Sequence, residues 1–390
     1  MCFCYNFAAD KAVRDCYKVE ETMKKKIIFV VIPLLLPIMS CGNGETKPQK
    51  SYFENWNECS SLTSLKEYVA KVTNKNDKEN FIPVEDRIAT FDMDGTFIGE
   101  LYPSYFEYNM LEYRVLDDPT YKDKAPDDVK ETAQDIRDFV RTGKALPKYD
   151  DQYGFDIKHA LAAAKAYSGM TIKEFDEYVK EFAKKTPNGF TGMTYAESFY
   201  KPILDVFDYL KDNDFTYYVV SGSDRFICRA LVDSLGIDRN RVIGMDITLK
   251  STNQGENDGV NYTMTPEENL IRTDELIIKN LKTNKVKQIA QEIGKTPVLS
   301  FGNSGGDSAM HNYCLGNSKY KGTKAFMLVA DDDTRDHAKK FGETDEAFQT
   351  RINKLNDDWT KANYNVISMK NDFKTIYGAG VTKTDFVFPK

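Results

Sequence analysis

Two patterns of apolar and polar residues divide this chain. Short apolar runs at 87–91, 215–220, 297–301 and 324–330 have the length of buried strands, and each is followed by polar residues. Helical spacing between these runs predicts helices, for example over 202–211 and 285–293. Alternating strands and helices predict an α/β fold with a parallel sheet, whose ligands bind at the carboxyl ends of the strands.

Residues 97–200 follow a different pattern, which is helical, aromatic and charged and contains no predicted strand. Asp127 and Asp128 open one predicted helix and Gly143 ends it, while Thr171 and Glu174 form a predicted capping box for another. The first of these helices carries one apolar stripe, made of Val129, Ala133, Ile136 and Val140. A helical insertion after a strand is typical of a cap over an active site. We therefore predict a core of 84–100 and 200–390 and a helical cap of 101–199.

The segment after 236 predicts a small hairpin at the edge of the core. Residues 241–249 and 262–265 have strand-like composition, and the Gly- and Asn-rich residues 251–259 join them. We expect these two segments to pair.

The N-terminal residues have the pattern of an export signal. Met23 and three lysines precede an apolar run over 27–39, which closes at Cys41 and resembles a bacterial lipoprotein signal. We expect 1–22 to be an artefact of an upstream start, 23–41 to be the signal and 42–83 to be a tether with a lead-in helix. A lipid on Cys41 would attach an exported protein to a membrane surface, periplasmic or on the outer membrane.

Composition narrows the class of protein further. The 390 residues are 41% hydrophobic and 29% charged, which is typical of a globular chain. The net charge of −7 offers no basic surface to a nucleic acid backbone. Cys59, Cys228 and Cys314 form no CxxC pair, and the three histidines show no metal-ligand spacing.

The candidate chemistry begins at the end of the first predicted strand, in Asp92-Met93-Asp94-Gly95-Thr96. Two carboxylates at the end of a buried strand are costly unless they are paired, hydrogen-bonded or bound to metal. Mg²⁺ prefers such oxygen ligands and is usually held together with a substrate phosphate. An Asp-Gly turn in a solvated loop is the alternative interpretation.

Later motifs favour the chemical interpretation. Ser221-Gly222 follows the second predicted strand, and Gly302-Asn303 with Asp307 follows the third. Asn284 is the predicted N-cap of a helix, which places Lys285 in its first turn. In this order, these motifs make residues 84–335 resemble a phosphatase of the haloacid dehalogenase superfamily. The position of the cap makes the chain most similar to the phosphoserine phosphatase and phosphorylcholine phosphatase branch.

The resemblance implies roles for these residues. Asp92 would be the nucleophile that forms an aspartyl-phosphate, and Asp94 the general acid and then the base. Phosphate would be bound by backbone N–H groups at Gly95 and Thr96. The Ser221 hydroxyl and the backbone N–H of Gly222 would bind it as well. Lys285 would neutralise charge between nucleophile and phosphate, with Lys287 as the alternative lysine.

The fourth motif departs from the family pattern. The family usually has Gly-Asp where this chain has Gly302-Asn303. The resemblance implies Mg²⁺ as cofactor, held by Asp92, Asp94, Asn303 and Asp307. Because an asparagine carbonyl brings no charge, we expect weaker metal binding.

Candidate substrate-binding residues follow the first motif. Glu100 lies one residue before the position at which the phosphoserine branch reads a substrate ammonium, and Arg137 or Arg141 could supply a cap arginine for a carboxylate. Several aromatic residues crowd the entry to the cap, where they could attract a quaternary ammonium group or pack cap against core: Tyr102, Tyr105, Phe106, Tyr108 and Tyr113.

Three functions remain open from sequence. The first is a Mg²⁺-dependent hydrolase of a small phosphorylated metabolite, similar to phosphoserine or phosphorylcholine. The second is a lipoprotein that binds phosphate esters without hydrolysing them, which the Asn303 departure would explain. The third is a phosphotransferase or mutase of the same fold.

Overall fold

The computed structural model describes residues 51–101, 103–148 and 154–388. The predicted export signal, the lipidated Cys41 and the candidate substrate residue Tyr102 lie outside these residues. Within the described part of the chain, none of the helices has the length and apolar character needed to cross a membrane.

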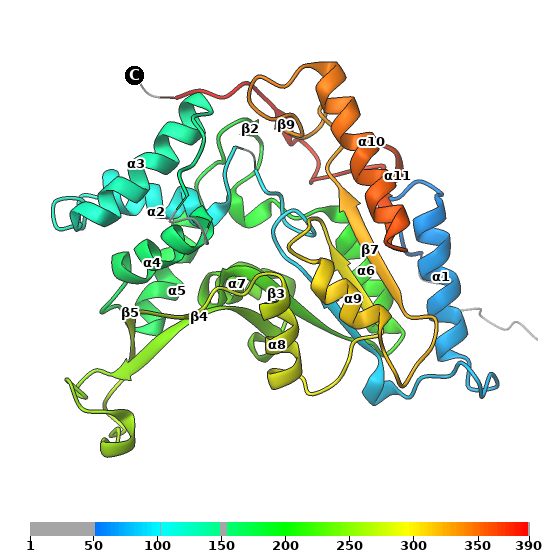
Figure 1. Cartoon of the computed structure of the whole chain (residues 1–390), viewed down its shortest axis with the longest axis horizontal. Coiled ribbons are helices and arrows are strands. Elements are labelled where there is room, and N and C mark those ends of the chain that lie inside the picture. Colours follow the sequence, from blue (N-terminus) through cyan, green and yellow to red (C-terminus); the bar gives the residue numbers. More distant parts are fainter. Residues whose placement is uncertain (1–50, 102, 149–153, 389–390) are drawn as a thin grey trace, which may run out of the picture. The chain divides into compact units, whose positions relative to one another are not determined.

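The described residues are organised around a seven-stranded sheet (Figure 1). Its strand order is β5-β4-β3-β1-β6-β7-β8, and every neighbouring pair is parallel except the antiparallel pair β4 and β5. The predicted α/β class is therefore confirmed. The strands are β1 (Ile88–Phe91), β3 (Thr216–Asp224), β4 (Val242–Ser251), β5 (Leu270–Ile278), β6 (Leu299–Gly302), β7 (Lys324–Val329) and β8 (Asn365–Ser368).

Strand β1 occupies the centre of the sheet and is buried along its whole length. Phe91, its last residue, pairs with Val219 of β3 and with Phe301 of β6. The rings of Phe91 and Phe301 are stacked with centroids 4.3 Å apart, and Phe326 of β7 continues the stack at 4.7 Å. This aromatic row aligns the carboxyl ends of three strands, because each cross-strand aromatic contact favours one register.

Helices connect and cover the strands. The helix α1 packs against β7 and β8, α6 and α7 pack against β3, α8 contacts β3 and β4, and α9 contacts β6 and β7. The helices of this part are α1 (Ser60–Thr73), α6 (Lys201–Asp212), α7 (Arg225–Val232), α8 (Thr283–Glu292), α9 (Ser308–Leu315), α10 (Asp345–Lys361) and α11 (Met369–Asp372).

The region between β1 and α6 is helical, as its sequence pattern indicates. It contains α2 (Phe106–Leu116), α3 (Asp127–Thr142), α4 (Phe155–Ala166) and α5 (Ile172–Ala183). Gly143 ends α3 in a left-handed conformation with φ of 71°, and Thr171 and Glu174 form the predicted capping box of α5. A two-residue strand, β2 (Phe190–Thr191), was missed; it pairs with β9 (Thr382–Lys383) near the C-terminal end.

The predicted hairpin is wrong in its second strand. β4 pairs with 270–278 and not with 262–265, which belong to the connecting segment. β5 is an edge strand on which most side chains are at least partly exposed, so its sequence lacks the apolar run or clean alternation of a buried strand. The predicted N-cap of α8 is also wrong, because the cap is Lys282 and not Asn284.

Candidate active site

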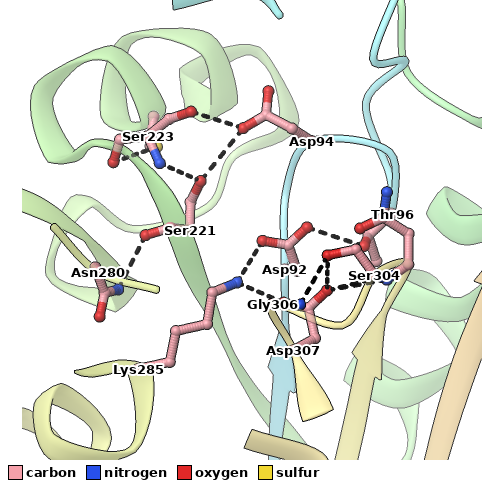
Figure 2. A network of polar contacts seen from close by, with 12 residues as sticks. Asp92, Asp94, Thr96, Ser221, Ser223, Asn280, Lys285, Ser304, Gly306 and Asp307 are labelled. Atoms are coloured by element: carbon pink, nitrogen blue, oxygen red, sulfur yellow. Dashed lines mark hydrogen bonds and ion pairs between the residues drawn. The ribbon is translucent and has the colours of Figure 1, made fainter. Parts of the chain in front are cut away.

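A buried lysine joins two carboxylates at the carboxyl edge of the sheet (Figure 2). The Nζ of Lys285 lies 2.5 Å from Oδ1 of Asp92 and 2.6 Å from Oδ1 of Asp307. All three side chains are buried, with Lys285 only 1% exposed. Charges buried this deeply are stable only when paired, and here one cation serves two anions. The predicted lysine is thus brought to the predicted nucleophile, whereas Lys287 is exposed.

The pKa values in this group reflect burial and pairing. Burial, followed by repulsion from Asp307, raises the pKa of Asp92 to about 7. Burial opposes the charge on Lys285, but attraction to Asp307 and Asp92 outweighs it and raises the lysine pKa above its ordinary range. Although burial also opposes ionisation of Asp307, the lysine holds the pKa of that carboxyl below its ordinary value.

Both oxygens of Asp307 have protein partners. Oδ1 accepts from Lys285, and Oδ2 accepts from the backbone N–H groups of Asn303 and Ser304, each at 3.1 Å. The loop after β6 approaches this side chain so closely that a Cβ on Gly302 would lie 2.6 Å from the Asp307 Cβ. Asp307 therefore orients the lysine and the loop, and it lies deep beneath the site.

The second aspartate of the first motif has different partners. Oδ2 of Asp94 accepts from the hydroxyl of Ser223 at 2.8 Å and from that of Ser221 at 3.4 Å. Burial, followed by repulsion from Glu107, raises the pKa of Asp94 to about 6. The two aspartates thus differ in environment: Asp92 lies against a cation, and Asp94 against neutral hydroxyl groups. Since burial raises the pKa of both carboxyl groups, the two aspartates differ in their partners and not in the direction of the pKa shift.

The structure adds Ser223 to the predicted second motif. Gly222 and Ser223 line the cavity described below, while Ser221 is fully buried and accepts from the backbone N–H of Ser223 at 3.0 Å. Asn280 supports this turn by donating to the Ser221 carbonyl at 2.9 Å. The Ser-Gly-Ser sequence contained the signal for Ser223, but only the folded turn distinguishes the two hydroxyls.

Glu100 and Asn303 are paired at the same cavity as Asp92. The amide nitrogen of Asn303 donates to Oε1 of Glu100 at 2.8 Å. Burial raises the pKa of Glu100 to about 7, and repulsion from Asp92 contributes further. Asn303 is thus brought to the site as predicted, and Glu100 reaches the same side of it.

A cavity of about 240 Å³ opens over these groups. Among the described residues, six carboxylates and three lysine ammonium groups line it, a formal excess of three negative charges. The acidic residues are Asp92, Asp94, Glu100, Glu107, Asp156 and Asp307, and the basic ones are Lys279, Lys282 and Lys285. A phosphate dianion would be repelled from such a lining unless a cation or protons compensated it.

The cavity continues into a second space of about 320 Å³ that shares Glu100, Tyr105, Tyr108 and Asp156 with it. The other described residues that line this space are Pro103, Ser104, Phe139, Leu146 and Phe155, so no described residue in its lining is basic. Tyr108 donates to Asp156 at 2.9 Å. We call this space the outer compartment.

The predicted cap residues separate into two groups. Tyr105 and Tyr108 line both spaces, whereas Phe106 packs edge-on against Phe182 and Tyr195 in the interior of the cap. Arg137 pairs with Glu112 and Asp117, and neither Arg137 nor Arg141 lines either space.

A buried ion pair crosses from α2 to the end of β5. Lys279 donates to Oε1 of Glu107 at 3.1 Å, and Oε2 of Glu107 accepts from the Asp224 N–H at 3.2 Å. Both side chains line the cavity, close to Asp94. Sequence reasoning missed this pair, because the residues are 172 positions apart and neither belongs to a motif.

The available oxygen donors fit a hard divalent cation that keeps water ligands. Among the described residues, no cluster of three or more His, Cys, Asp or Glu side chains is arranged to hold a metal alone. Mg²⁺ usually needs only one or two carboxylates, with water and phosphate completing its shell. Asp92, Glu100 and the Asn303 carbonyl at the acidic cavity match that chemistry.

Comparisons with known proteins give structural similarity only. No protein-family model and no curated protein matches the chain. A functionally unknown protein from Anaerococcus prevotii is similar with a TM-score of 0.48 and 14% identity, over 84% of this chain and 98% of that one. Cytosolic 5'-nucleotidase IIIB bound to cytidine is similar with a TM-score of 0.41 and 13% identity, over 76% of this chain and 92% of that one. A phosphoserine phosphohydrolase-like protein from Francisella tularensis is similar with a TM-score of 0.35 and 14% identity, over 62% of this chain and 87% of that one.

Proposed function

We propose that this protein is a phosphomonoester hydrolase of the haloacid dehalogenase type. The observation that carries the proposal is the position of Asp92, paired with buried Lys285 at the end of the central strand and 2.5 Å from its ammonium group. A carboxylate beside a buried ammonium group is a nucleophile suited to phosphorus. The same pair gives no evident benefit to stability that apolar side chains could not supply.

The chain's own residues can be assigned to each step. An Asp92 oxygen forms a bond to phosphorus while the bond from phosphorus to the leaving oxygen breaks, and Asp94 gives that oxygen its proton. Asp94, now ionised, then takes a proton from water; the water oxygen bonds to phosphorus, which frees Asp92 and phosphate. Lys285 stays paired throughout and limits the charge at Asp92. A bound Mg²⁺ would neutralise the phosphoryl oxygens in the acidic cavity.

The charge of the outer compartment supports a cationic leaving group. Its lining includes the carboxylate of Asp156 beside the rings of Tyr105, Tyr108 and Phe155. Acidic and aromatic groups together attract an organic ammonium ion. We therefore favour phosphate esters of amino or quaternary ammonium alcohols over sugar phosphates.

The test is phosphate release from a panel with Mg²⁺: phosphorylcholine, phosphoethanolamine, phosphoserine and two sugar phosphates. We expect release from the cationic esters, and its loss in Asp92→Asn. Asp156→Asn should raise KM for cationic esters and leave KM for sugar phosphates unchanged. Absence of release from every ester, with binding still measurable, would favour the binding protein. Phosphate transfer to an added alcohol in place of water would favour the phosphotransferase.

We further propose that a lipid on Cys41 attaches the protein to a periplasmic or outer-membrane surface. The proposal is supported by the basic and apolar sequence before Cys41. Expression of Cys41→Ser in a bacterial host should leave the signal uncleaved and the protein without a lipid, so the processed, lipidated form should be absent from the membrane fraction. Unchanged processing and attachment would show that the cysteine has no such role.

A further inference from the structure

The asparagine in the fourth motif is paired with a carboxylate from another segment, that of Glu100. Asn303 stands where the resembled family has an aspartate, so β6 ends one negative charge short. The amide nitrogen of Asn303 donates to Oε1 of Glu100, which is 203 positions away in the chain. Both side chains line the cavity with Asp92. A carboxylate is thus held at the place where the motif itself lacks one.

Gly95 shows that this pairing is built into the first motif. Gly95 has φ of +74°, and a Cβ there would lie 2.0 Å from the Asn303 amide nitrogen and 2.8 Å from Cγ and Oε1 of Glu100. The two side chains therefore lie directly against the turn between Asp94 and Thr96. No alanine could occupy position 95 without displacing them, because the neighbouring atoms already fill the space.

The remaining oxygens are available for a ligand. Among the described residues, Oε2 of Glu100 and Oδ1 of Asn303 have no hydrogen-bond partner, and Oδ2 of Asp92 accepts only from Thr96, at 3.1 Å. Asp307, by contrast, has both oxygens committed to Lys285 and to backbone N–H groups, and is 1% exposed. Besides Asp92, the carboxylate at Asn303 that keeps an oxygen without a described partner is therefore that of Glu100.

We propose that Glu100 supplies the second carboxylate for a divalent cation at Asp92, and that Asn303 positions Glu100 for this role. The proposal rests on the proposed phosphatase function for the presence of a cation, and it reassigns Glu100 from substrate to metal. Mg²⁺ held by two carboxylates is an ordinary arrangement in phosphate-processing sites. Glu100, which follows β1, thus supplies the negative charge that Asn303 does not supply after β6.

The experiment is calorimetric titration of the purified protein with MgCl₂ alone, so that binding is read without turnover. We expect Glu100→Gln to weaken Mg²⁺ binding roughly 10- to 100-fold, and the double variant Glu100→Gln/Asn303→Asp to recover most of it. The double variant moves the negative charge from position 100 to position 303, so it tests directly whether one carboxylate can replace the other. Asp156→Asn is the matched control, because it removes a carboxylate from the same cavity on the helical side; its Mg²⁺ affinity should equal that of the wild type.

Two results would overturn the proposal. One is wild-type Mg²⁺ affinity in Glu100→Gln. The other is an equal loss in Glu100→Gln and Asp156→Asn, which would mean that overall cavity charge, and not a ligand, sets the affinity. Thermal unfolding without Mg²⁺ confirms that the variants fold. Loss of turnover in all ester assays with Mg²⁺ binding intact would refute the phosphatase and leave the metal site standing.

Discussion

The ammonium group of Lys285 lies 2.5 Å from Oδ1 of Asp92, which it reaches across 193 residues of sequence. It lies equally close to Asp307, at 2.6 Å. The lysine sits in the first turn of α8, where the helix dipole disfavours a cation, so its placement depends on these two anions. This pairing makes the site sensitive to the loss of a single charge.

Lys285→Met should leave Asp92 and Asp307 buried without their cation. Breaking a buried pair in this way costs roughly 3–5 kcal/mol in the free energy of unfolding, and phosphate release should be lost. Urea denaturation measures the first effect. Lys287→Met removes an exposed lysine two positions away, and its free energy of unfolding should stay within about 0.5 kcal/mol of the wild type. Equal stability of the two variants would contradict the structural role of Lys285.

Asp94→Asn should slow turnover by roughly 10²–10⁴-fold on alkyl phosphates, because their leaving oxygen needs a proton. The loss should be smaller on an aryl phosphate, whose leaving group departs as a stable anion. Rates of the variant and the wild type on both kinds of ester give the comparison. If the fold-loss is the same for alkyl and aryl esters, Asp94 is not the proton donor.

Gly95→Ala should combine backbone strain with a clash. A left-handed alanine costs about 1–2 kcal/mol, and its Cβ would also lie 2.0 Å from the Asn303 amide nitrogen. We expect lower stability and loss of phosphate release. Gly236→Ala is the control, because Gly236 has φ of +66° and open space around its Cβ position; it should show the strain and keep the activity. Full activity in Gly95→Ala would refute the close packing at this turn.

His159 should make the protein sensitive to acid. It is fully buried, and its pKa falls from the ordinary 6.5 to about 3, first through burial and then through the nearby Lys279. The folded state therefore binds fewer protons than the unfolded chain between these values, so stability is lost as pH falls from about 6.5 toward 3. His159→Gln should lose less stability than the wild type between pH 7.5 and 5, as measured by urea denaturation. Parallel losses in both proteins would assign the acid sensitivity to other groups.

Arg272 and Asp224 form another buried pair, 2.7 Å apart, with the guanidinium 3.8 Å from the ring centroid of Phe175 in α5. Arg272→Met should cost roughly 3–5 kcal/mol in the free energy of unfolding, because Asp224 stays buried and unpaired. Lys354→Ala removes an exposed pair with Asp358 and should change stability by less than about 1 kcal/mol. Chemical denaturation of both variants decides whether burial is the source of the difference.

Local patterns predicted much of this protein. The strands β1, β3, β6 and β7 were recognisable as apolar runs, and the helix ends at Gly143 and Thr171 as capping signals. Such features depend on residues within a few positions of one another. The proposed roles of Asp92 and Asp94 came instead from the order of the motifs along the chain, through the resemblance that this order carries.

The failures have a common physical cause. β5 was missed because an exposed edge strand is stabilised by pairing with β4 and not by its own apolar pattern. Ser223 and the Glu107–Lys279 pair were missed because their roles depend on which side chains face the cavity.

The α/β class and the helical insertion could be predicted from sequence, because both follow from local periodicity and residue type. Tertiary structure alone decided that Lys285 and not Lys287 meets Asp92, and that Glu100 lies against Asn303. Those choices depend on the alignment of strand ends from distant segments, because a contact of 2.5 or 2.8 Å between such segments is set by packing and not by sequence spacing.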